Sequence, residues 1–273
     1  MNKEFDSRPG SLPERLEAPP GSPSLYMIYD LMEHCSRKGG FVIDIGAQAG
    51  QEALPLSQYL GADGHVYCFE PLSHLIKDNI ERFSNYNFDN ITVDERGVYC
   101  VDRKEKTLIE DHNNSATSSF VEEMIDDWKG APFFGGVYTN CTEKGIVTTT
   151  LDSVFEGQPI DFIKSDAQGA DPYILLGALN TLEQNRCPLI LEWSNVPNGL
   201  SDWAFSYLSS LGYNIYIIDG LSYKKNKISK SKWGSPNYRE QVFKKCLTQC
   251  KQSEDIYVAK FKYYDLFCTT HDI

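Results

Sequence analysis

The chain has 273 residues, a formal net charge of −12 at pH 7 and a sequence pI of about 4.9. A chain of this length can bury a full hydrophobic core, so we expect one α/β domain. The acidic balance argues against nucleic acid as a partner or main substrate, because phosphates are bound by clustered Lys and Arg side chains. One basic cluster, with five lysines in residues 224–232, is interpreted as a solvated loop.

Composition also bears on location. The first ten residues contain no apolar run of signal-peptide length, and no other stretch is long and apolar enough to span a bilayer. The eight cysteines are scattered and form no C-x-x-C pair, which is typical of reduced thiols that pack as small apolar side chains. We therefore expect a cytoplasmic protein without a membrane span or a structural zinc ion.

Helices and strands alternate along the first part of the chain. Residues 1–23 contain five prolines among charged residues and predict a flexible tail. Apolar residues at helical spacing from Ser24 to Cys35 predict a helix, which the glycines at 39 and 40 end. The next expected elements are strands at 41–45, 65–69 and 90–93 and helices at 51–60 and 72–83.

The rest of the chain continues this alternation with two interruptions. A domain over 24–273 is expected, with insertions near 102–147 and 219–254. A hairpin is expected at 98–109, followed by a lid at 110–136. Further expected elements are strands at 145–150, 159–165, 188–193 and 213–218, helices at 174–182 and from 201, and a last strand at the sheet edge at 255–261. This order predicts a mostly parallel, seven-stranded, Rossmann-like sheet with helices on both faces.

A glycine turn follows the first strand and is the first candidate binding site. It contains Gly46, Ala47, Gln48 and Gly50. Backbone N–H groups in such a turn can face an anionic or polar ligand, and glycine has no Cβ to keep the ligand away. The spacing is not the G-x-G-x-x-G of dinucleotide-binding proteins. Asp44, which ends the strand, can meet a cationic amino group.

A second acid follows the second strand. Glu70, with Pro71 after it, stands where a carboxylate can accept two hydrogen bonds from a ribose diol. Asp44 can bind an ammonium group and Glu70 can bind a ribose. This pair of acids fits S-adenosylmethionine better than NAD. Asp94, followed by Glu95 and Arg96, comes after the third strand and is expected to edge an adenine pocket. The alternative is that these acids only cap helices.

Two more acids fall at predicted strand ends. Asp166 follows the strand at 159–165, and Glu192 lies near the end of the strand at 188–193. Ligands of open parallel sheets bind beyond the carboxyl ends of the strands. We therefore expect Asp44, Glu70, Asp166 and Glu192 to share one site.

The chain resembles the FkbM family of S-adenosylmethionine-dependent methyltransferases over roughly residues 41–193. The resemblance rests on motifs at Val42–Gly50, Phe69–Pro71, Thr150–Ser153, Ile160–Asp171, Leu176–Ala178 and Pro188–Glu192. It implies a class I methyltransferase fold and O-methylation of hydroxyls on sugars or small metabolites. Two positions depart from the family pattern: Gln48 stands where Asn is common, and Gln168 stands where Glu is common.

Methyl transfer to a hydroxyl needs alignment and is helped by a base or a metal ion. Asp166 is the leading candidate for the base, and its alternative role is a structural or cofactor contact. His112, the histidine of the expected lid, and Glu192 are further catalytic candidates. A magnesium ion between Asp166 and Glu192 is an alternative, although no third ligand is evident.

Two other functions compete with methyl transfer. An NAD-dependent reductase is disfavoured, because the glycine spacing is wrong and no Tyr-x-x-x-Lys pair follows the fourth strand. A non-catalytic protein that binds the cofactor or a partner is favoured only by Gln168, which removes a charge beside the expected site.

Overall fold

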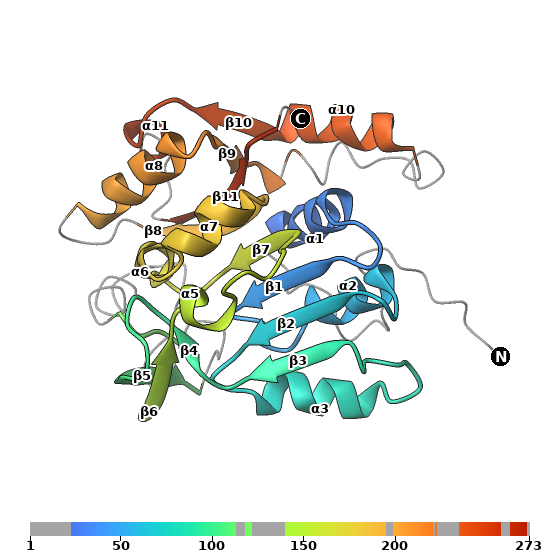
Figure 1. Cartoon of the computed structure of the whole chain (residues 1–273), viewed down its shortest axis with the longest axis vertical. Coiled ribbons are helices and arrows are strands. Elements are labelled where there is room, and N and C mark those ends of the chain that lie inside the picture. Colours follow the sequence, from blue (N-terminus) through green and yellow to red (C-terminus); the bar gives the residue numbers. More distant parts are fainter. Residues whose placement is uncertain are drawn as a thin grey trace.

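The computed structural model describes residues 23–112, 118–121, 140–194, 199–220, 222, 235–257 and 263–271. In these ranges the chain forms an eight-stranded sheet in the order β10-β9-β11-β8-β7-β1-β2-β3 (Figure 1). The strands are β1 (Phe41–Ile45), β2 (His65–Phe69), β3 (Ile91–Asp94), β7 (Phe162–Ser165), β8 (Leu189–Ser194), β9 (Asn214–Ile218), β10 (Leu247–Cys250) and β11 (Tyr263–Thr269).

The sheet is mostly parallel, as predicted. β11 runs antiparallel to its neighbours β8 and β9, β10 runs antiparallel to β9, and the other strands share one direction. The expected Rossmann-like class I methyltransferase fold is thereby confirmed. The described sheet has one strand more than expected, because β10 adds a strand from within the insertion near 219–254.

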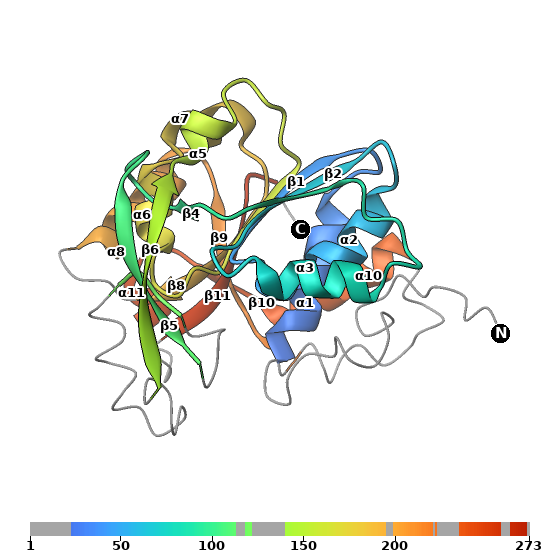
Figure 2. The same ribbon diagram turned by 90° about the horizontal axis from the view of Figure 1, so that it is seen from below.

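Helices cover both faces of the sheet (Figure 2). One face carries α1 (Pro23–Cys35), α2 (Ala53–Leu60), α3 (His74–Arg82) and α10 (Pro236–Cys246). The other face carries α5 (Leu151–Val154), α6 (Asp171–Leu176), α7 (Leu179–Asn185), α8 (Leu200–Ser210) and α11 (Glu254–Tyr257). Within the described ranges, no helix has the length and apolar character needed to cross a membrane.

Strand side chains alternate between two hydrophobic cores. Ile43 and Ile45 of β1 belong to the core under α6 and α8, whereas Val42 belongs to the core under α1, α2 and α10. In β8, Leu191 and Ile190 divide between the same two cores. A strand buried on both faces needs apolar residues at successive positions, which is the pattern that identified these strands in the sequence.

A small second sheet lies beside the main one. It has the order β4-β6-β5, with β4 (Gly97–Val98), β5 (Glu105–Asp111) and β6 (Cys141–Thr149). The expected hairpin at 98–109 is wrong, because β4 and β5 pair with β6 and not with each other. The true partner strand is supplied by residues 30 positions (Asp111 to Cys141) to 51 positions (Gly97 to Thr148) further along, beyond the reach of a local pattern.

Two further elements differ from expectation. The helix expected at 174–182 is divided into α6 and α7. Gly177 directly follows α6, and a Cβ there would lie 2.3 Å from the carbonyl oxygen of Tyr99, so a larger residue does not fit at the break. The last strand is β11, placed between β8 and β9 and not at the sheet edge, and the helix α11 occupies the start of the range 255–261. The tail 1–22, the lysine-rich residues 223–234 and most of the expected lid lie outside the described residues.

Candidate active site

The carboxyl ends of β1 and β7 define the candidate site. These neighbouring strands are parallel, and the chain continues from β1 toward β2 and from β7 toward β8, in opposite directions along the sheet. Such a reversal is where open α/β sheets bind their ligands. The glycine turn after β1 and the turn that carries Asp166 meet at this point.

Gly46 brings the two turns into contact. Its φ is +73°, and a Cβ there would lie 2.0 Å from the carbonyl oxygen of Asp166. The Gly46 N–H donates to the carbonyl of Phe69 at 2.9 Å, and the Gly50 N–H donates to the carbonyl of Ala47 at 2.7 Å. Gln48 adopts a left-handed conformation with a φ of +45°. The expected tight turn is therefore formed, and it packs against both β2 and β7.

Glu70 fastens this turn to the end of β2. Its Oε2 accepts the N–H of Gln48 and its Oε1 accepts the N–H of Leu72, each at 2.7 Å. Burial raises the pKa of Glu70, and these two hydrogen bonds oppose the shift. Pro71 continues the turn, and its carbonyl accepts the ammonium group of Lys144 at 3.3 Å. Both Glu70 oxygens thus organise the backbone around the expected ribose position.

Asp44 forms an ion pair that the sequence did not reveal. Its Oδ1 lies 3.2 Å from Nζ of Lys164, and both side chains are buried. Burial raises the pKa of Asp44, and Lys164 opposes the shift. Burial alone would lower the pKa of Lys164, but the charges of Asp44, Glu52 and Asp166 hold it well above its usual value. A charged residue near the end of an otherwise apolar strand was the available signal for Lys164.

The Lys164 ammonium also reaches the two turns. It donates to the carbonyl of Gly46 at 3.3 Å and lies 4.0 Å from Oδ2 of Asp166. Asp44 therefore supports the glycine turn from beneath, through Lys164, and its own carboxylate is enclosed by protein.

Two other buried carboxyl groups were missed by the sequence analysis. Burial raises the pKa of Glu52 to about 7, with Lys164 opposing the shift and Asp44 adding to it. Burial also raises the pKa of Asp171 to about 7, although its Oδ1 accepts the hydroxyl of Ser165 at 2.6 Å. Each has one carboxyl oxygen without a hydrogen-bond partner among the described residues. Groups that titrate near neutral pH beside a ligand position are typical of functional sites.

Asp166 and Glu192 are brought together by a residue between them in space. The side-chain amide nitrogen of Gln168 lies 2.8 Å from Oδ1 of Asp166 and 3.2 Å from Oε1 of Glu192. Asp166 is 34% exposed at its side chain, whereas Glu192 is buried. Burial, followed by the charges of Asp166, Asp171 and Asp265, raises the pKa of Glu192 well above its usual value.

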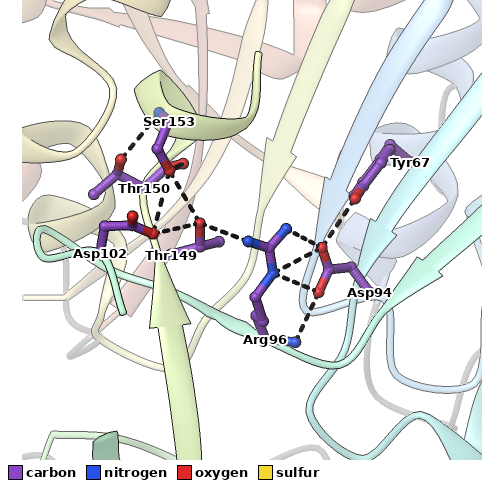
Figure 3. Close-up of polar contacts among 7 residues, drawn as sticks. All are labelled: Tyr67, Asp94, Arg96, Asp102, Thr149, Thr150 and Ser153. Atoms are coloured by element: carbon purple, nitrogen blue, oxygen red, sulfur yellow. Dashed lines mark hydrogen bonds and ion pairs between the residues drawn. The ribbon is translucent and has the colours of Figure 1, made fainter. Parts of the chain in front are cut away.

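Asp94 lies at the end of β3 in a separate polar network (Figure 3). Its carboxylate accepts the hydroxyl of Tyr67 at 2.9 Å and forms an ion pair with Arg96 at 2.5 Å. Although burial raises the pKa of Asp94, the hydrogen bonds from Arg96 and Tyr67 bring it below its usual value. The Arg96 guanidinium also donates to the hydroxyl of Thr149 at 3.2 Å, so the network joins β3 to β6.

The network continues into the helix that begins after β6. The Thr149 hydroxyl donates to Oδ1 of Asp102 at 3.0 Å and lies 3.1 Å from the hydroxyl of Ser153. Thr150 caps α5 by accepting the N–H of Ser153 at 3.1 Å. Figure 3 shows these residues as a continuous chain of polar contacts between the edge of the main sheet and the small one.

His112 lies at the end of β5, away from the carboxyl pair in its contacts. Its Nε2 is 2.9 Å from the hydroxyl of Thr142, and its Nδ1 is 3.7 Å from Oε1 of Glu110. Among the described residues, its hydrogen bonds and ion pairs involve neither Asp166 nor Glu192. The structure therefore does not group His112 with the other catalytic candidates.

The magnesium alternative finds no support in the side chains present. In the described part of the chain, no three or more His, Cys, Asp or Glu side chains are grouped to hold a metal ion. The residue between Asp166 and Glu192 is Gln168, whose amide nitrogen faces both acids as a donor. A metal ion would need an oxygen ligand at that position.

The charges around the two turns favour a cationic ligand. Six acids, Asp44, Glu52, Glu70, Asp166, Asp171 and Glu192, are linked by electrostatic interactions, and Lys164 acts on five of them. A positively charged ligand would relieve this excess, and the sulfonium and ammonium groups of S-adenosylmethionine supply such charge. The candidate cofactor residues therefore fit the expected cofactor chemically.

The sheet order and the glycine turn define a Rossmann-like fold. The model of the Methyltransferase FkbM domain family matches residues 44–215, and the chain belongs to this family. This membership confirms the family resemblance seen in the motifs. No curated protein matches the chain.

Three solved structures illustrate the likeness of the fold. Methyltransferase FkbM from Methylobacillus flagellatus KT is 19% identical, with a TM-score of 0.43 over 64% of this chain and 39% of that one. Precorrin-6y C5,15-methyltransferase from Geobacter metallireducens GS-15 is 10% identical, with a TM-score of 0.43 over 98% and 100%. The SAM-dependent O-methyltransferase from Thermotoga maritima is 11% identical, with a TM-score of 0.38 over 94% and 67%. The chain thus spans 39% of the length of the first of these structures.

Proposed function

We propose that the protein transfers a methyl group from S-adenosylmethionine to a hydroxyl oxygen of a sugar, a glycan or a small metabolite. Membership of the FkbM family supports the methyl transfer. The observation that carries the choice of an oxygen acceptor is the partly exposed Asp166 carboxylate at the end of β7, held beside the glycine turn. A hydroxyl is a poor nucleophile, and a carboxylate in this position can accept its proton.

The cofactor is expected to lie across the carboxyl ends of β1, β2 and β3. We assign its amino-acid end to the turn of Gly46, Ala47, Gln48 and Gly50, above the Asp44–Lys164 pair. Its ribose is assigned to Glu70 and Pro71, and its adenine to the edge formed by Asp94. The acidic surroundings of Asp166 favour a sulfonium at the point where β1 and β7 meet.

In the proposed step, the acceptor oxygen attacks the methyl carbon from the side opposite the C–S bond that breaks. When bound, S-adenosylmethionine supplies a methyl group already activated by its sulfonium. Asp166 accepts the hydroxyl proton as the new C–O bond forms and the C–S bond breaks, and the sulfur keeps the electron pair of that bond. Glu192, buried and with a raised pKa, holds Asp166 through Gln168. For His112, which lies in the expected lid, the proposed role is a contact with the acceptor.

The proposed organisation and location follow the sequence. We propose one methyltransferase domain over 24–273 with a flexible tail at 1–23 and with the insertions near 102–147 and 219–254 shaping the acceptor site. A cytoplasmic location is proposed because all eight cysteines are free thiols.

Calorimetry tests the cofactor, and a labelled methyl group tests the reaction. We expect S-adenosylhomocysteine to bind and NADH not to bind in parallel titrations. Radiolabelled S-adenosylmethionine, incubated with a panel of free sugars, glycans and polyhydroxylated metabolites, should label at least one member. Binding without label on any member would favour the non-catalytic alternative, and saturation by NADH alone would refute the proposal.

Asp166→Asn separates the base from the binding site. The substitution keeps the size of the side chain and removes its basicity, so we expect labelling to fall at least about a hundredfold while S-adenosylhomocysteine still binds. Retained labelling would remove Asp166 from the role of base.

A further inference from the structure

Gln168 occupies an unusual position between the two acids of the site. It lies in the turn between β7 and α6 with a φ of +51°, and Gly169 after it has a φ of +89°. This backbone conformation directs its side-chain nitrogen to Oδ1 of Asp166 at 2.8 Å and to Oε1 of Glu192 at 3.2 Å. A carboxamide NH₂ group has two hydrogens, so one side chain can donate to both carboxyl groups.

The amide donor of Gln168 compensates part of the negative charge around the buried Glu192 carboxyl group. Glu192 is 6% exposed, and its Oε2 has no hydrogen-bond partner among the described residues. Asp166 and Asp171 add negative charge beside it. A glutamate at 168 would place a third carboxyl group here and remove both donors. Carboxylates this close cannot all ionise unless a proton or a cation joins them.

The turn that carries Gln168 is also hydrogen-bonded to Ser119, a residue of the expected lid. The hydroxyl of Ser119 donates to the carbonyl of Gln168 at 2.7 Å and accepts the N–H of Val121 at 3.0 Å. The backbone of Ser119 pairs with Ile109 at the end of β5, and the Ser119 side chain is buried. Residues 118–121 lie within the expected lid, so the backbone of Gln168 is held from the side on which the acceptor is expected.

We propose that Gln168 is a positioning residue, whose amide clamps Asp166 to Glu192 and lets this carboxyl pair work without a divalent cation. The inference rests on the proposed function for the role of Asp166. In this arrangement the uncharged amide joins two carboxyl groups, whereas three carboxylates at the same place would need a bridging cation. A glutamate at this position would offer a third carboxylate to a cation, whereas Gln168 offers a hydrogen-bond donor and leaves methyl transfer intact.

Manganese binding tests the clamp directly, because Mn²⁺ is detected by electron paramagnetic resonance and takes oxygen ligands as Mg²⁺ does. The near-isosteric Gln168→Glu removes both donors and adds a carboxylate. We expect Q168E to bind Mn²⁺ at least about tenfold more tightly than the wild type, since affinity rises with the number of charged ligands. The double variant Q168E/E192Q should lose this gain. Equal Mn²⁺ affinity in the wild type and Q168E would overturn the proposal.

A matched variant controls for the strained backbone. Arg186 is also a non-glycine residue in the left-handed conformation, with a φ of +47°, at the C-terminal end of α7. Arg186→Ala should leave Mn²⁺ binding as in the wild type. A gain in R186A equal to that in Q168E would show that general loosening, and not the third carboxylate, produces the effect.

The failure of this inference and the failure of the proposed function are distinguishable. Wild-type protein that does not bind S-adenosylhomocysteine would refute the function. Wild-type and Q168E proteins that both bind it, with no gain of Mn²⁺ in Q168E, would refute the clamp alone. In the labelling assay we expect the wild-type rate to be insensitive to EDTA and the Q168E rate to rise when Mn²⁺ is added. A wild-type rate abolished by EDTA would also contradict the proposal.

Discussion

Asp44 and Lys164 are cross-strand partners, in register on β1 and β7, with their charged atoms 3.2 Å apart. Both side chains are buried, and the Lys164 ammonium also reaches the carbonyl of Gly46. The pair therefore couples the stability of the sheet to the shape of the glycine turn. Glu52, at the start of α2, depends on the same cation.

Lys164→Met should destabilise the protein strongly. The substitution removes the cation and leaves Asp44 as an unpaired buried acid, so we expect the free energy of unfolding to fall by about 3 to 5 kcal/mol in urea denaturation. The double variant D44N/K164M no longer buries that charge and should be more stable than K164M. A double variant as unstable as the sum of D44N and K164M would mean that the two side chains do not interact.

Gly46→Ala should abolish cofactor binding, because its Cβ would lie 2.0 Å from the carbonyl oxygen of Asp166. Gly157→Ala is the matched control: Gly157 has a φ of +72° against +73° for Gly46, but a Cβ there would meet nothing within 4 Å. The control should lose about 1 to 2 kcal/mol for the left-handed backbone and keep its affinity for S-adenosylhomocysteine. Calorimetry of both variants makes the comparison, and equal affinities would contradict the role of the close approach.

The sequence predicted what local patterns determine. β2 was predicted to the residue, and the strand at 41–45 was correct, because apolar runs there are bounded by glycines and acids. The positions of Asp44, Glu70 and Asp166 at strand ends follow from the alternation of strands and helices. Their shared location follows from parallel pairing, which places the carboxyl ends of strands at one edge.

Contacts between distant segments were not predictable in the same way. The pairing of β5 with β6 and the insertion of β11 between β8 and β9 depend on partners far apart in the sequence. The same holds for the ion pair of Lys164 with Asp44 and for the hydrogen bond from Gln168 to Glu192. Each of these contacts becomes visible only in three dimensions. From the sequence, Lys164 was only a charged residue in a strand, and Gln168 was only an uncharged residue where the family commonly has Glu.

Arg96→Ala should weaken the connection between β3 and the small sheet. Arg96 pairs with Asp94 at 2.5 Å and donates to Thr149, so the loss of its side chain leaves Asp94 with the hydroxyl of Tyr67 and the backbone N–H of residue 96 (Figure 3). We expect a loss of about 1 to 3 kcal/mol in the free energy of unfolding. Arg103→Ala is the control, because Arg103 is 90% exposed and pairs with Asp102 at 3.3 Å, and it should cost no more than about 1 kcal/mol. Thermal or urea unfolding of both variants compares them, and equal losses would contradict the structural role of Arg96.

Asp171 should make the protein less stable as the pH rises. Its pKa is about 7 in the folded protein and 3.8 in its unperturbed state, so the folded protein binds more protons between these values. The stabilisation is complete below about pH 4 and is lost as the pH rises through about 7, with a total on the order of 4 kcal/mol. Asp171→Asn should flatten this part of the profile in denaturation measured from pH 4 to pH 8. An unchanged slope in D171N would show that Asp171 does not hold the proton.

The same titration should make the site discriminate between the two forms of the cofactor. Glu52 and Asp171, whose pKa values are each about 7, lose their protons near neutral pH and leave the site more negative. S-adenosylmethionine carries a positive sulfonium that S-adenosylhomocysteine lacks, so the ratio of their affinities should rise in favour of S-adenosylmethionine as the pH increases from about 6 to about 7.5. An attraction of about 1 kcal/mol per ionised carboxylate corresponds to a several-fold change in this ratio.

Calorimetry in two buffers of different ionisation enthalpy measures the linked protons. The cation favours the ionised carboxylates, so S-adenosylmethionine should release more protons on binding near pH 7 than S-adenosylhomocysteine does. The double variant E52Q/D171N cannot titrate at these positions and should show the same affinity ratio at both ends of the pH range. A wild-type ratio that stays constant, or that falls with rising pH, would mean that the sulfonium does not lie near the acids grouped around Lys164.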